Sequence, residues 1–157
     1  MRRMLYASRS EALGFAQRAR ANLKHIQEAR RGGSDIHEVT QIGLSLLGIV
    51  VFPREQQLLN RLPKKRLEVL YLQGWPRWHI QLGTAKTLSD LIDRVRNATA
   101  HGRIKFSSES REPKDVMVTV EDAKSKTSPV TWRAEILASD LRDFCFRFLD
   151  LIEDEIG

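Results

Sequence analysis

The sequence is poor in the residues that build disulfides, cysteine-based metal sites and membrane spans. Its 157 residues include one cysteine, Cys145, which excludes an intrachain disulfide and a cysteine-cluster zinc site. The longest apolar-rich run, residues 42–52, is interrupted by Ser45 and is too short to cross a bilayer. The basic N-terminus is not followed by the apolar stretch of about 7–15 residues that a secretory signal needs. We therefore expect a cytoplasmic protein that does not enter a membrane.

The motifs of common metal, nucleotide and hydrolase sites are also missing. His37 and Glu38 begin like a zinc-binding H-E-x-x-H helix, but Gln41 stands where the second histidine is required. There is no Walker-type phosphate loop and no serine-centred elbow. Cys145 lies among apolar residues at helical spacing, which favours a buried structural thiol. We expect neither a metal ion nor a cofactor.

Basic charge is what the chain has in excess, and it is unevenly placed. Lys and Arg number 26 against 20 Asp and Glu, for a net charge of +6 and a pI near 9.8. The first 33 residues carry eight basic and two acidic side chains, whereas the last 23 carry two and seven. A basic body with an acidic end favours a polyanionic partner such as nucleic acid, although many basic proteins bind none.

The length and the 41% of hydrophobic residues predict a single domain, residues 1–157, with its own core. Helical periodicity predicts four main helices: from Ser8 or Ser10 to Gly32-Gly33, from Asp35 to Pro53, from Thr87 to Gly102, and from Ser139 onward. One or two shorter helices, broken at Pro63, are expected over 54–72, and a loop over 73–86. Residues 104–106, 116–120 and 130–132 read as a two- or three-stranded antiparallel meander. The fold class is therefore mostly α, a helical bundle with a small antiparallel β insertion at about 103–135, before the last helix.

One segment, residues 96–101, carries a plausible set of catalytic groups. Arg96 is a permanent cation that can hold a phosphate, and His101 can exchange a proton near neutral pH. Asn97 lies four residues before His101, on the same side of a helix, where it can orient the imidazole. Arg96 and His101 are about 140° apart on an ideal helix, so we expect fraying beside Gly102 to bring the imidazole toward Arg96.

These residue types suit metal-free cleavage of RNA. The histidine moves protons at the 2′-hydroxyl or the leaving 5′-oxygen, and the arginine stabilises the extra charge on the phosphate. The structural alternative is that Arg96 pairs with Asp93 and that His101 caps the helix C-terminus.

Two weaker pairs of residues are candidates for substrate binding. Arg103 and Lys105 follow the motif and can hold flanking phosphates, or they can be the solvated edge of a strand. Thr40 and Gln41 are polar residues on an apolar helix, and they either line a cleft or bond to neighbouring backbone.

Trp75 and Trp78, which lie close together in the sequence, also have two possible roles. If exposed, they can stack on bases, and the structural alternative is that at least one of them packs into the core.

The motif segment resembles the signature of the HEPN superfamily, in which an arginine and a histidine are separated by four to six residues. Here Arg96 and His101 enclose four residues, and the polar Asn97 follows the arginine. Residues 35–53 look like the second helix of the pEK499 p136-like HEPN group, which also has a β-rich stretch after the motif and a closing helix. The resemblance covers roughly residues 35–155.

This resemblance implies an α-helical bundle that acts as a metal-independent endoribonuclease in a toxin or phage-defence setting. It implies catalytic roles for Arg96, Asn97 and His101, a homodimer with a composite site, and an antitoxin or other regulatory partner. HEPN toxins that are silenced by adenylylation carry a tyrosine two residues after the histidine, where this chain has Arg103, so we do not expect that silencing. The alternatives are a non-catalytic RNA-binding module and a protein-interaction module.

Overall fold

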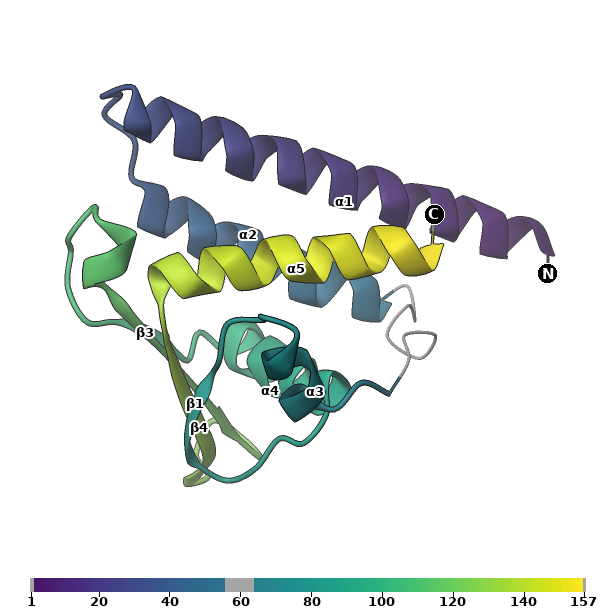
Figure 1. The fold of residues 1–157 in the computed structure, drawn as a ribbon. Coiled ribbons are helices and arrows are strands. Elements are labelled where there is room, and N and C mark those ends of the chain that lie inside the picture. The colour runs from purple at the N-terminus through teal and green to yellow at the C-terminus, as the bar shows by residue number, and fades with distance from the viewer. Residues whose placement is uncertain (1, 56–63, 157) are drawn as a thin grey trace. The chain divides into compact units, whose positions relative to one another are not determined.

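The structure is a computed structural model that describes residues 2–55 and 64–156 (Figure 1). It is mostly helical, with a small antiparallel sheet, as the sequence predicts. The elements are, in order, α1 (Arg2–Arg31), α2 (Glu38–Glu55), α3 (Leu67–Leu72), β1 (His79–Leu82), α4 (Leu88–Ala100), β2 (Ile104–Phe106), the 3-10 helix η2 (Pro113–Asp115), β3 (Met117–Ala123), β4 (Val130–Leu137) and α5 (Ala138–Ile156). They form two compact units, Met1–Leu62 with Cys145–Gly157, and Pro63–Phe144.

The first unit is helical, and α1 packs along α2. Its core holds apolar side chains at helical spacing, namely Ala16 and Leu23 of α1, Val39, Ile42 and Leu46 of α2, and Cys145, Phe148, Leu149 and Ile152 of α5. Arg20 of α1 forms ion pairs with Asp150 and Glu153 of α5. Cys145 is buried as expected, and the loss of solvation raises the pKa of its thiol to about 12. None of the helices that the structure describes is long and apolar enough to span a bilayer.

Several helix boundaries differ from the predicted ones. α1 begins at Arg2, so Ser8 and Ser10 lie inside it instead of capping it, because residues 2–7 contain no helix breaker. α2 begins at Glu38, later than Asp35 suggests, and continues past Pro53 to Glu55. A proline in the last turn removes one backbone donor but leaves room for two more helical residues. Of the short helices predicted over 54–72, the described part contains α3, and Pro63 lies outside the described residues.

The second unit contains a four-stranded antiparallel sheet with the order β1-β4-β3-β2. β2, β3 and β4 form the predicted meander, with Ile104 opposite Val120 and Val120 opposite Ala134. β4 runs to Leu137, further than predicted, and α5 begins at the next residue, so that Ser139 lies in the first turn instead of capping the helix.

The fourth strand, β1, was not predicted, because its segment reads as part of a loop. It pairs with the outer edge of β4, where His79 lies opposite Glu135. The strand has four residues and is mostly exposed. Its polar and apolar residues alternate, but over so short a length that the Gly, Pro and Trp residues around it favour a loop. Backbone pairing with β4 decides its conformation, and the sheet therefore includes residues from both sides of α4 in the chain.

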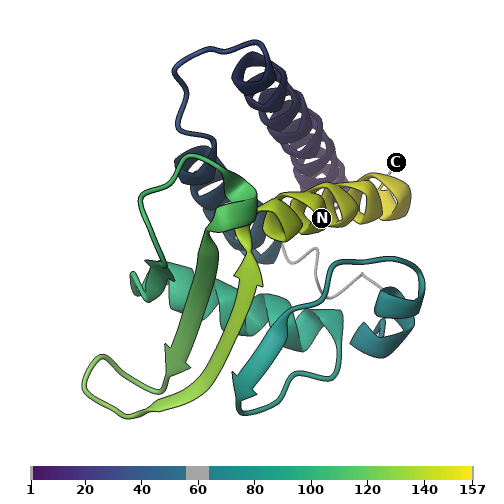
Figure 2. The same ribbon diagram turned by 60° about the vertical axis from the view of Figure 1, so that its left-hand side comes forward.

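α4 packs against β3 on the covered face of the sheet. Along both central strands every second side chain is buried on that face. The buried side chains are Val118, Val120 and Asp122 on β3 and Trp132, Ala134 and Ile136 on β4. α4 contributes the predicted apolar side of an amphipathic helix: Leu88, Leu91, Ile92, Val95 and Ala98. Figure 2 shows α4 crossing behind β3 and β4.

We expect Gly83 to be the glycine of this unit that tolerates substitution least. It has φ +78°, and a Cβ there would lie 2.8 Å from the carbonyl oxygen of Thr131 and 2.9 Å from Cδ1 of Trp132. Gly102 has φ +67° but no atom within 4 Å of a Cβ, so it is a matched control for backbone strain alone. Gly102→Ala should lower the free energy of unfolding by about 1 kcal/mol, and Gly83→Ala by clearly more. Equal losses in urea unfolding would contradict the steric argument.

Candidate active site

The helix that carries the arginine–histidine motif has a well-defined start. Oγ1 of Thr87 accepts a hydrogen bond from the Asp90 backbone N–H at 3.1 Å, and Oδ2 of Asp90 accepts one from the Thr87 N–H at 3.2 Å. A capping box is therefore present, with aspartate in place of the more usual glutamate. Because both of these backbone donors are satisfied, α4 has a fixed start and a fixed register.

The end of the same helix is equally well defined, and Gly102 ends it as predicted. Gly102 donates to the carbonyl of Thr99 at 3.1 Å, and Arg103 donates to the carbonyl of Ala98 at 2.8 Å. With φ +67° at Gly102, these bonds make a Schellman motif. His101 is the C-cap residue, with near-helical φ and ψ of −98° and 9°. The expected fraying is therefore not seen, because the glycine lets the chain close this turn with two hydrogen bonds.

The three motif side chains leave α4 at different positions. His101 is exposed, whereas Asn97 and Arg96 are half-buried. Asn97 lies one turn before His101 on the same side, but its amide forms no hydrogen bond with the imidazole among the described residues, so the expected orienting contact is not present. With the helix end ordered, Arg96 and His101 of one chain remain about 140° apart around the axis.

Most of the basic side chains next to the motif have partners that the sequence does not reveal. Arg94 Nη1 lies 2.9 Å from Oδ2 of Asp122, a buried carboxylate on β3. Lys105 Nζ lies 3.1 Å from Oε1 of Glu121, and Arg133 also contacts that carboxylate, at 3.7 Å. The hydrogen bond from Lys105 and the two positive charges hold the pKa of Glu121 below its usual value.

Arg103, the other basic candidate, points toward backbone instead of solvent. Its Nη2 donates to the carbonyl oxygens of Ser125 and Lys126, both at 3.0 Å, in the loop between β3 and β4. Arg103 and Lys105 thus already hold protein partners, and phosphate binding by either remains a prediction.

The remaining candidates lie elsewhere. Thr40 is exposed and Gln41 half-buried on α2, in the other compact unit, and Oγ1 of Thr40 lies 3.2 Å from Nδ1 of His37. Trp78 is buried and Trp75 half-buried, and both rings make edge-to-face contacts with Phe144, at centroid distances of 5.7 and 5.6 Å. The prediction that at least one tryptophan packs into the core is confirmed.

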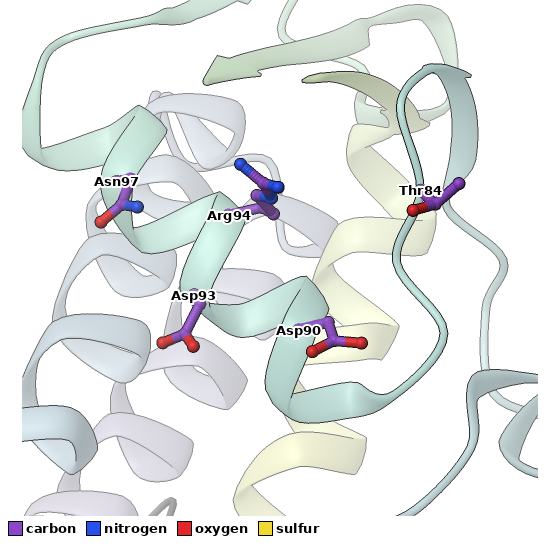
Figure 3. Close-up of a pocket in the computed structure, with 5 residues that line it drawn as sticks. All are labelled: Thr84, Asp90, Asp93, Arg94 and Asn97. Carbon is purple, nitrogen blue, oxygen red and sulfur yellow. The ribbon is translucent and has the colours of Figure 1, made fainter. Parts of the chain in front are cut away.

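A polar pocket of about 400 Å³ lies beside the motif on α4 (Figure 3). Its lining comes from one side of the helix and from the loop after β1, namely Asp90, Asp93, Arg94, Asn97 and Thr84. Figure 3 shows Asp93 and Asn97 one turn apart on one side of α4, with Thr84 across from the helix on the loop. The lining includes two carboxylates, of which Asp90 accepts the capping hydrogen bond from Thr87, and the guanidinium of Arg94, which is paired with Asp122.

Sequence reasoning missed this pocket and the partners of the basic residues. Asp122 is 28 residues from Arg94, and no local spacing connects the two. Across the described ranges no group of three or more metal-ligating side chains comes together.

We expect Arg94 to act as a structural arginine. Arg94→Ala should lower the free energy of unfolding by about 1–3 kcal/mol, because the buried Asp122 carboxylate loses a charged hydrogen-bond partner. Lys105→Ala is the matched control, since it breaks an ion pair whose lysine is 73% exposed and should cost about 1 kcal/mol or less. Urea unfolding measures both. An Arg94→Ala loss no larger than the control would contradict the structural role.

Comparison with known proteins identifies the family of this chain. The sequence model of the family described as HEPN pEK499 p136 matches residues 4–157, which include both compact units and the complete motif. Searches of curated proteins and of solved structures found no significant match. The match covers far more than half of the sequence and agrees with the resemblance seen at Arg96, Asn97 and His101. The chain belongs to the HEPN pEK499 p136 family.

Proposed function

We propose that the chain is a metal-independent endoribonuclease of the HEPN type, with His101 and Arg96 as its catalytic residues. The observation that carries the proposal is the position of His101, which is exposed at the ordered end of α4, five residues after Arg96. Membership of a HEPN family supports an RNA-related module. An exposed imidazole on a fixed backbone is accessible to a strand and can be aimed at one of its atoms.

The reaction that these groups suit is a transesterification within RNA. The 2′-oxygen loses its proton and attacks the adjacent phosphorus, the bond from phosphorus to the 5′-oxygen breaks, and that oxygen takes up a proton. His101 serves as the general base or the general acid, and Arg96 stabilises the negative charge on the phosphate oxygens. The products are a 2′,3′-cyclic phosphate and a 5′-hydroxyl.

A second copy of the chain completes the site in this proposal. One chain directs Arg96 and His101 to different sides of α4, and a single histidine cannot serve as base and acid at once. A two-fold axis beside the C-terminal end of α4 supplies a second Arg96, Asn97 and His101. The exposed and small Ala100 allows a second copy of the chain to approach α4 closely there. Ala98 is equally small, but it is buried within its own chain and does not contact a second copy.

The biological setting is the second part of the proposal. We propose a toxin or phage-defence role, with RNA as substrate and an antitoxin or other regulator as partner, and membership of a HEPN family supports this role. Because Arg103 stands two residues after His101, regulation acts on something other than a tyrosine at that position.

His101→Ala should lower the rate of RNA cleavage about 100-fold or more, because it removes a proton-transfer group. Its melting temperature should stay close to that of the unmodified chain, since the side chain is exposed. His79→Ala is the matched control: this histidine is also exposed, but it lies on β1. Arg96→Ala should lose a similar factor, and Asn97→Ala less. Cleavage should persist in EDTA, and mass spectrometry should find cyclic phosphate ends.

A strict requirement for Mg²⁺, or cleavage of DNA, would contradict this mechanism, because DNA lacks the attacking hydroxyl. Specific RNA binding without turnover, with binding lost in His101→Ala, would instead indicate an RNA-binding module.

The active unit should sediment as a homodimer at micromolar concentration. Activity per chain should fall on dilution, in parallel with the dimer fraction, because each composite site needs residues from both copies. Sedimentation velocity and a dilution series of cleavage rates test this together. A monomer that cleaves at an unchanged rate per chain would rule out the composite site.

A further inference from the structure

The loop between β3 and β4 carries two lysines whose charges no described residue neutralises. Lys124 and Lys126 are both exposed, and neither forms an ion pair with the residues that the structure describes. The loop also has internal order, since Oγ of Ser125 lies 2.7 Å from Oγ of Ser128 and the Ser128 N–H donates to Ser125. Its lysines are thus attached to a turn with a defined backbone.

Arg103 ties this loop to the end of the motif helix. Its N–H bonds Ala98 of α4 at 2.8 Å, its carbonyl accepts from Glu121 of β3 at 3.1 Å, and its guanidinium donates to Ser125 and Lys126. One residue therefore connects α4, β3 and the loop, two positions after His101. These contacts hold the backbone of the lysine-bearing loop to the residue that lies two positions after His101.

We propose that Lys124 and Lys126 bind backbone phosphates of the RNA strand next to the cleaved bond, and that Arg103 is the positioning residue that holds them there. The inference rests on the proposed function, because it takes RNA to be the ligand. It assigns flanking phosphate binding to two lysines outside the motif, in place of Arg103 and Lys105.

The charge distribution of the unit favours these two lysines over their neighbours. Lys105 and Arg133 share Glu121, and Arg94 is held by Asp122, so these three cations contact two carboxylates, whereas neither loop lysine forms an ion pair with a described residue. The guanidinium of Arg103 also covers two carbonyl oxygens that would otherwise repel phosphate oxygens. Lysine ammonium groups on flexible stems match a single strand, whose phosphate positions vary.

The test measures binding of a fully 2′-O-methylated single-stranded RNA, which cannot be cleaved, as a function of salt concentration. Lys124→Gln and Lys126→Gln should each weaken binding about fivefold at 0.1 M salt and reduce the slope of log K against log salt by about 0.7, the value for one phosphate contact on a single strand. Lys114→Gln is the matched control, because this exposed lysine lies before β3, at the end of the strand away from the loop. Loop variants that bind like the control would overturn the proposal.

Substitutions at Arg103 separate positioning from direct contact. Arg103→Gln should weaken binding on its own but add little to the Lys124→Gln/Lys126→Gln double variant, because the lysines it positions are already absent. Arg103→Lys should resemble Arg103→Gln, since an ammonium group cannot hold both carbonyls in the same way. Additive losses, or full affinity in Arg103→Lys, would mean that Arg103 itself binds phosphate and would overturn its positioning role.

The same measurements distinguish failure of this inference from failure of the proposed function. RNA cleavage that is abolished in His101→Ala but unchanged in the loop variants overturns the inference and leaves the nuclease intact. Salt-dependent RNA binding through the lysines without any cleavage overturns the nuclease and supports the phosphate site. No RNA binding at all overturns both.

Discussion

The immobilisation of α4 at both ends and along one side is the constraint on which the rest of the site depends. The Thr87 capping box holds its start, the Schellman motif at Gly102 holds its end, and Arg94 ties its middle to Asp122 on β3. A proton-transfer group is useful only if its backbone does not move during the reaction. In the proposed mechanism His101 is that group, and the hydrogen bonds of the C-terminal turn hold its backbone although its side chain is exposed.

The sheet supports the helix and also determines which charges remain available to a partner. Carboxylates of β3 lie where they pair with nearby cations: Asp122 with Arg94, and Glu121 with Lys105 and Arg133. These pairs remove positive charge from the space around the motif, so that net charge alone does not describe the surface a polyanion would meet. The exposed Lys124 and Lys126 extend beyond the paired region on a loop that Arg103 holds.

α4 also lines a polar pocket, whose side chains include Asp90, Asp93 and Asn97, whereas the loop between β3 and β4 presents lysines. A nucleic-acid strand has both kinds of complement, base amino groups and phosphates. Asn97, which no described side chain bonds, lies in the pocket one turn from His101, so the motif helix contributes to the pocket while the loop contributes the cations.

The sequence by itself determined the features of this protein that depend on local interactions. Helical periodicity identified α4 and α5, Thr87 marked the start of α4 and Gly102 marked its end, because each of these signals involves residues within about one helical turn. The Arg96–His101 spacing, together with the pattern of residues 35–53, indicated the family. The tertiary structure alone decided the conformation of β1, whose four residues become a strand by pairing with β4. It alone decided that Arg94 and Lys105 are paired and that Arg103 holds a loop, because their partners lie 16 to 28 residues away. Such contacts form only when the sheet is assembled, since no local spacing in the chain encodes them.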